Sequence, residues 1–125
     1  MNAIKVTKQK ILYVFTAAPY SAPNGQEGLD AVLMGTAFEQ DISVLFVHDG
    51  VFQIKSGQDT SASKIKQFTK TFQALGDFDV ENLYVFDISL AARGLSTEQL
   101  SCPVKVIDSL SVAKLIKQQH KVFTF

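Results

Sequence analysis

This sequence of 125 residues has a single cysteine, no tryptophan and no excess charge of either sign. One cysteine cannot form a disulfide within the chain, and residues 1–10 lack the apolar stretch of a signal peptide, so we expect a reducing, cytoplasmic setting. Twelve basic and twelve acidic side chains give zero formal net charge. Direct nucleic-acid binders usually display a basic face, so this composition predicts no direct contact with nucleic acid.

Long hydrophobic runs and linkers are also missing. The apolar run at 11–15 is far shorter than the roughly 20 residues that a membrane helix needs, so no contact with a membrane is expected. No Pro/Gly/Ser-rich tract or charge block marks a domain boundary. With 46% hydrophobic residues, the chain is predicted to form one domain over 1–125, with residues 1–8 flexible or peripheral.

Five short segments rich in β-branched and aromatic residues predict strands. Several are apolar at consecutive positions, which is typical of parallel strands covered on both faces. The predicted strands are 11–15, 42–47, 83–86, 104–107 and 122–125.

Helical patterns lie between these strands. One extends from about 26 to 39, and an amphipathic helix carries Ile65, Phe68, Phe72 and Leu75. A third precedes the last strand, with Asp108, Ser109 or Ser111 as its cap. A short helix around 90–93 is expected to end at Gly94. This alternation predicts a flavodoxin-like, three-layer, doubly wound α/β sheet of about five mostly parallel strands.

The turn at 48–53 closes the second predicted strand, and sites gather outside the carboxyl ends of parallel strands. His48 beside Asp49 has the chemistry of a general base with an orienting carboxylate, but adjacent residues tend to point apart and no nucleophile is evident. A solvated loop histidine is the favoured interpretation. Gly50 suits the turn itself, and Val51-Phe52 is an apolar pair that a monomer is expected to have difficulty burying.

Three other candidate sites have weaker support. The loop at 16–25 leads into a helix but has one glycine and two prolines, which argues against an anion cradle. Asp49 and Asp87 both follow strands, yet the remaining residues of a receiver-like acidic pocket are missing. Cys102 is the one thiol that can carry sulfur, and a structural role is favoured because Lys105 is the only nearby cation in sequence. No cofactor or metal site is predicted.

Four motifs stand out along the chain: GQEGLDA at 25–31, DGVFQ at 49–53 with Gly57-Gln58, TFQALG at 71–76, and SLAARGL at 89–95. Together and in this order they resemble the DsrF/TusC branch of the DsrE/DsrF-like sulfur-relay family. The resemblance implies a subunit of a cytoplasmic TusBCD-like heterohexamer, a dimer of heterotrimers with TusB-like and TusD-like partners. It also implies indirect contact with TusA-like and TusE-like carriers, in a relay that forms 2-thiouridine at the tRNA wobble position.

In the sulfur-carrying relatives, the active cysteine lies just after the third strand. Here that segment reads Phe86-Asp87-Ile88-Ser89, so the resemblance implies a non-carrier subunit without enzymatic activity of its own. The expected interface loop is Asp49, Gly50, Val51, Phe52 and Gln53. Two alternatives stay open: a DsrF-like subunit of a DsrEFH complex in sulfur oxidation, and a persulfide-accepting sulfurtransferase that uses Cys102.

Overall fold

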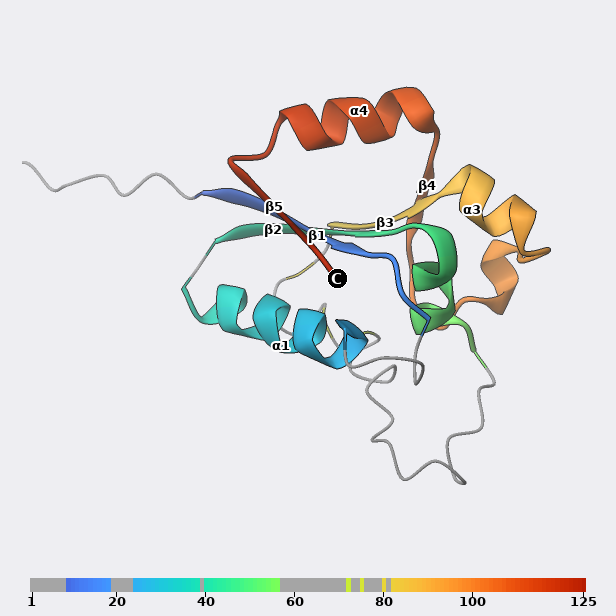
Figure 1. Cartoon of the computed structure of the whole chain (residues 1–125), viewed down its shortest axis with the longest axis horizontal. Helices are drawn as coiled ribbons and strands as arrows, with labels where there is room; N and C mark the ends of the chain where they lie inside the picture. The colour runs from blue at the N-terminus through green and yellow to red at the C-terminus, as the bar shows by residue number, and fades with distance from the viewer. Residues whose placement is uncertain are drawn as a thin grey trace, which may run out of the picture.

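The structure is a computed structural model that describes residues 9–18, 24–38, 40–56, 72, 75, 80 and 82–125. Within this part of the chain, five strands form one sheet in which every neighbouring pair is parallel (Figure 1). The strands are β1 (Lys10–Phe15), β2 (Asp41–Phe46), β3 (Asn82–Phe86), β4 (Lys105–Ile107) and β5 (Lys121–Thr124). All five predicted strands are confirmed, each within one residue of its expected bounds.

The helices also follow the predicted order. They are α1 (Asn24–Ala37), α3 (Asp87–Ala92) and α4 (Ser109–Lys117), with two 3-10 helices, η1 (His48–Ile54) and η3 (Thr97–Gln99). The Asp108 carboxylate accepts a 2.8 Å hydrogen bond from the Ser111 amide, so Asp108 is the one of the three candidate residues that caps α4. Gly94 has a φ of 64° and follows the end of α3, which begins three residues earlier than predicted.

The predicted amphipathic helix around 65–75 lies outside the described residues, apart from two of its apolar positions. Phe72 and Leu75 are both fully buried. The Phe72 ring meets those of Phe15 and Phe46 edge-on, with centroids 5.2 and 5.4 Å apart. These two positions therefore belong to the core, as the apolar stripe predicted.

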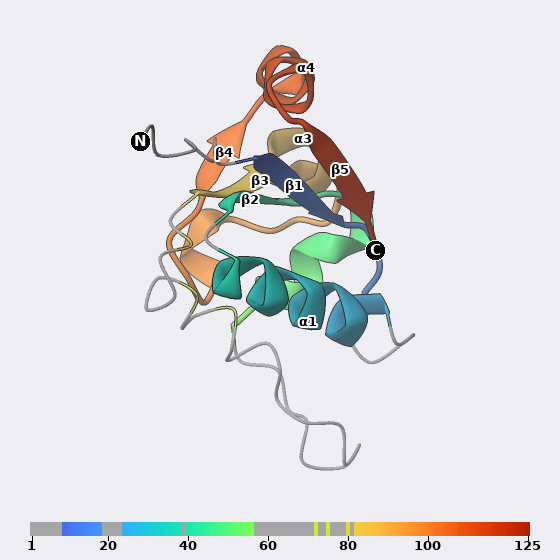
Figure 2. The ribbon, with the colours of Figure 1, turned by 90° about the vertical axis from the view of Figure 1, so that its left-hand side faces the viewer.

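The sheet lies between α1 on one face and α4 on the other, which gives the three predicted layers (Figure 2). The strand order is β4-β3-β2-β1-β5, so the chain crosses the sheet in one direction from β1 to β4 and returns past β1 to place β5. Right-handed crossovers in opposite directions put their helices on opposite faces. The order differs from the 2-1-3-4-5 of flavodoxin, because here the returning strand is the last one.

The central strands are buried on both faces, whereas β5 at the sheet edge is exposed along its whole length. On the α1 face, the core includes Tyr13, Phe15, Val32, Phe46 and Val85. On the α4 face, a smaller cluster consists of Leu12, Val14, Leu45 and Leu115. Among the described residues, no helix has the length and apolar character needed to cross a membrane.

Candidate functional site

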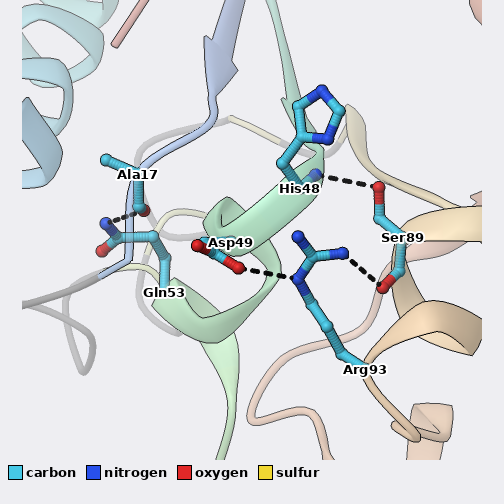
Figure 3. Close-up of polar contacts among 6 residues, drawn as sticks. All are labelled: Ala17, His48, Asp49, Gln53, Ser89 and Arg93. Carbon is cyan, nitrogen blue, oxygen red and sulfur yellow. Dashed lines mark hydrogen bonds and ion pairs between the residues drawn. The ribbon is translucent and has the colours of Figure 1, made fainter.

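The carboxyl ends of β1, β2 and β3 meet at one edge of the sheet, where η1 follows β2 and α3 follows β3. Figure 3 shows the side chains that connect these elements. Thr16 follows β1 directly, and both its amide and its hydroxyl donate to the Phe125 carbonyl, at 2.7 and 2.9 Å. Both Thr16 donors therefore form hydrogen bonds within the chain instead of facing an anion. The rest of the predicted anion loop, 19–23, lies outside the described residues.

Gly50 allows η1 to pack directly against the end of β1. A Cβ atom at this position would overlap the Phe15 carbonyl group and lie 3.0 Å from the Thr16 nitrogen. The same Phe15 carbonyl accepts a 3.0 Å hydrogen bond from the Val47 amide, which leads the chain into η1. Glycine at 50 is thus required by a close backbone approach, and this approach fixes where the turn lies.

His48 has a backbone φ of 50°, a left-handed conformation that is uncommon for a residue with a side chain. Its amide donates a 2.8 Å hydrogen bond to the hydroxyl of Ser89, which is 3% exposed on α3. In Figure 3 the imidazole points away from the Asp49 carboxylate. The backbone of His48, and not its imidazole, therefore makes the contact across the site.

The Asp49 carboxylate is paired with Arg93, which lies on the far side of the site. Arg93 Nε donates to Asp49 Oδ1 at 2.9 Å, and Arg93 Nη1 donates to the Ser89 carbonyl at 3.2 Å. Together with the bond from His48 to Ser89, these contacts join η1 to α3; we call His48, Asp49, Ser89 and Arg93 the polar clamp. Sequence reasoning missed Ser89 and Arg93 as contact residues, although both stand in the SLAARGL motif four residues apart on one helix face.

Most of the expected interface loop lies inside the molecule. Gly50 is buried, and Val51 and Gln53 are wholly inaccessible. The expectation that a monomer has difficulty burying Val51 is wrong, because the turn of η1 directs this side chain into the core under α1. Phe52 is half-buried, and the Asp49 side chain is 59% exposed, so these two residues offer the accessible surface of the loop.

Gln53 anchors the other end of η1. Its Nε2 donates a 3.0 Å hydrogen bond to the Ala17 carbonyl after β1, while its buried Oε1 accepts no hydrogen bond from any of the described residues. An unpaired buried amide oxygen costs on the order of 1–3 kcal/mol. The conformation of η1 thus depends on the packing of Gly50 against β1 and of Val51 in the core more than on the hydrogen bonds of Gln53.

The single thiol lies away from the polar clamp. Cys102 is 8% exposed, in the segment between η3 and β4, and belongs to the core cluster under α1. Burial raises the pKa of the Cys102 thiol to about 11. A thiol with this pKa is protonated at neutral pH and is a poor nucleophile.

The segment after β3 contains no thiol. Asp87, Ile88 and Ser89 form the first turn of α3, where Ile88 is 58% exposed and Ser89 is engaged by His48. Asp87 Oδ1 accepts a 2.6 Å bond from the Ile88 amide, and Asp49 is paired with Arg93. Within the described ranges, no three His, Cys, Asp or Glu side chains are placed to hold a metal ion.

The sequence profile of the DsrE/DsrF-like family matches residues 9–125, so the chain belongs to this family. It is 39% identical over 131 residues to the intracellular sulfur oxidation protein DsrF of Allochromatium vinosum, covering 94% of this chain and 96% of DsrF. It is 41% identical over 90 residues to protein TusC of Escherichia coli O9:H4, covering 72% and 76% of the two chains.

The crystal structure of the YchN protein from E. coli has the same fold. Its TM-score with this chain is 0.82, at 23% sequence identity, over 94% of this chain and 99% of YchN. These relatives confirm the predicted family and fold class, and they identify the chain as a DsrE/DsrF-like sulfur-relay protein related to both TusC and DsrF.

Proposed function

We propose that this chain is a non-carrier subunit of a cytoplasmic TusBCD-like sulfurtransferase complex. In that complex it packs against TusB-like and TusD-like subunits, and a partner supplies the cysteine that carries the persulfide. The relay runs from a TusA-like donor to a TusE-like acceptor and ends in 2-thiouridine at the tRNA wobble position.

The observation that carries this proposal is the absence of an available thiolate. The turn after β3 holds Asp87, Ile88 and Ser89, and the one cysteine of the chain is buried with a raised pKa. Sulfur transfer needs a nucleophilic thiolate that a second protein can reach. In this proposal the subunit binds and positions its partners, and a cysteine of a partner subunit carries the persulfide.

The test is reconstitution of the complex with and without Cys102. The TusB-like and TusD-like chains of the same host are co-expressed with this chain, and the purified complex is loaded with sulfur from a persulfide donor. Each subunit is then weighed by mass spectrometry. We expect added sulfur on a partner only and unchanged transfer in the Cys102→Ser complex. Added sulfur on Cys102, with loss of transfer in the variant, would instead identify a persulfide-accepting subunit.

The accessibility of the thiol gives an independent readout. Because the pKa of Cys102 is raised from its ordinary 9.0 to about 11, the folded chain is expected to react slowly with iodoacetamide at neutral pH. The rate should rise as the pH approaches 11, and the chain unfolded in urea should react faster at every pH below that. Equal rates in the folded and unfolded chain would contradict the buried thiol.

A second candidate function rests on the 39% identity to DsrF over 94% of this chain. In that case the same architecture serves a DsrEFH-like complex in sulfur oxidation. Deletion of the gene separates the two functions, because loss of 2-thiouridine supports the tRNA pathway and loss of growth on reduced sulfur supports the oxidative one.

A further inference from the structure

An apolar groove runs along the edge of the sheet between α1 and β5, with a volume of about 370 Å³. Its floor is formed by Ile11 and Tyr13 of β1. Its walls come from Met34 and Phe38 at the α1 end and from Phe123 of β5. We call this feature the β5 groove.

The walls of the β5 groove are unusually exposed for large apolar side chains. Met34 and Phe38 are 66% and 68% exposed, and Phe123 is 43% exposed. Val122, on the opposite face of the same strand, is 41% exposed. Parallel strands are normally covered on both faces, so β5 presents to solvent a surface of the kind that elsewhere in this sheet is buried.

The backbone of β5 adds hydrogen-bonding groups to this surface. β5 ends the strand order and pairs with β1 on one side only, so no described strand occupies its outer side (Figure 2). Exposed edges are usually protected by a short strand, by lysine or proline, by a bulge or by inward-pointing charges, and β5 has only its short length of four residues and Lys121. β5 reads Lys-Val-Phe-Thr, and only its first residue is charged.

Three lysines lie near the start of β5. Lys121 begins β5 and lines the groove, whereas Lys10 at the start of β1 and Lys117 in the last turn of α4 lie on the opposite face of the sheet. None of these lysines forms an ion pair with any described residue. Asp41 begins β2 opposite Lys10 in the sheet register, one strand farther from the groove. Among the described residues, the charges without an ion-pair partner at the start of β5 are therefore basic.

We propose that the β5 groove is the surface on which a related subunit docks, through an extended segment that lies along the free edge of β5. This inference rests on the proposed function. The segment carries an apolar side chain that enters the groove between Met34 and Phe123, and acidic side chains that face Lys121 and Lys117. Backbone pairing along the edge supplies hydrogen bonds, and the groove selects the side chain.

The experiment compares two exposed helical positions of equal accessibility. Met34 lies in the groove and is 66% exposed, while Leu110 lies on α4 and is 65% exposed. Each is changed to Glu in the full chain, which is co-expressed with the TusB-like and TusD-like chains of its host. Assembly is measured by pull-down through a tag on the TusD-like chain and by native mass spectrometry. Thermal unfolding of each purified variant shows that the fold is retained.

We expect Met34→Glu to reduce assembly on the order of tenfold or more, because it places a charge in an apolar contact that an acidic partner occupies. Leu110→Glu should assemble like the unaltered chain. Lys121→Glu should also weaken assembly, and its effect should shrink at high salt because the lost attraction is between charges.

Three results would overturn the inference. If the unaltered chains assemble and Met34→Glu assembles equally well, the docking surface is elsewhere while the proposed function stands. If the unaltered chains do not assemble, both fail. If the chain alone is a dimer that Met34→Glu converts to a monomer, the groove holds a second copy of this chain instead of a related subunit.

Discussion

The polar clamp and the β5 groove both lie at the margins of one sheet. The polar groups of the clamp are paired within the chain, whereas the apolar side chains of the groove are exposed to solvent. In the clamp, the His48 amide, the Asp49 carboxylate and the Arg93 guanidinium all find partners within the chain. In the groove, the large apolar side chains of Met34, Phe38 and Phe123 remain exposed beside a strand edge that no described strand pairs.

This difference separates a structural role from a binding role. A polar network that is closed within the chain stabilises the local fold and has few free groups to offer a partner. Exposed apolar surface beside an unpaired backbone gains free energy when a second protein covers it. The DGVFQ motif thus mainly builds the fold of the turn, whereas the large exposed apolar side chains of Met34, Phe38 and Phe123 lie along the β5 groove.

The largest expected loss of stability comes from disturbing the close backbone contact between Gly50 and Phe15. Gly50→Ala should destabilise the protein by about 2–3 kcal/mol, because the added methyl group overlaps the Phe15 carbonyl and forces η1 away from β1. Urea unfolding monitored by circular dichroism measures the change.

Gly94→Ala is the matched control for that substitution. Gly94 has a positive φ, but a Cβ there would meet no atom within 4 Å, so only backbone strain of roughly 1–2 kcal/mol is expected. If Gly50→Ala proves no more destabilising than Gly94→Ala, η1 does not depend on its contact with β1.

A smaller loss of stability is expected when the polar clamp loses the Ser89 hydroxyl, which accepts a hydrogen bond from the His48 amide. Ser89→Ala removes the hydroxyl that binds the His48 amide and should cost about 1–2 kcal/mol, because a partly buried N–H is left unpaired while His48 keeps its left-handed backbone. The midpoint of urea unfolding reports the loss. Ser109→Ala, at an exposed position in α4, should change stability by less than about 0.5 kcal/mol.

The smallest effect is expected at the ion pair. Asp49→Asn should cost about 0.2–1 kcal/mol, since the Asp49 side chain is 59% exposed and solvent screens its attraction to Arg93. A double-mutant cycle with Arg93→Met isolates the pair, and its coupling energy should fall at high salt.

The same Asp49→Asn variant also tests the comparison of the two regions. If the β5 groove is the docking surface, assembly with the TusB-like and TusD-like chains should be unaffected by Asp49→Asn. Loss of assembly in this variant, with normal assembly of Met34→Glu, would show that the turn after β2 is the true interface.

Local patterns were sufficient to predict most of the fold. The consecutive apolar positions of β1 and β2 indicated buried parallel strands, three candidate caps at 108, 109 and 111 indicated the start of α4, and Gly94 indicated the end of α3. Each of these signals depends on residues that are close in sequence, because helix caps and strand patterns are local properties.

The candidate site was harder to predict because its contacts are between distant residues. Asp49 and Arg93 are 44 positions apart, and His48 and Ser89 are 41 apart. The burial of Val51 and Gln53 also depends on a distant contact, the fit of Gly50 against Phe15. A turn with one histidine and one aspartate therefore resembled a reactive loop, although its polar groups serve the packing of η1.

The sequence by itself determined the α/β class, the family and the absence of a thiol after β3, since these follow from periodicity, motifs and residue identity. Only the tertiary structure decided which groups are accessible. It placed β5 at the edge of the sheet, because the crossover from β4 returns past β1, and it buried most of the DGVFQ motif. Exposure depends on which elements become neighbours, and this is a property of the folded chain alone.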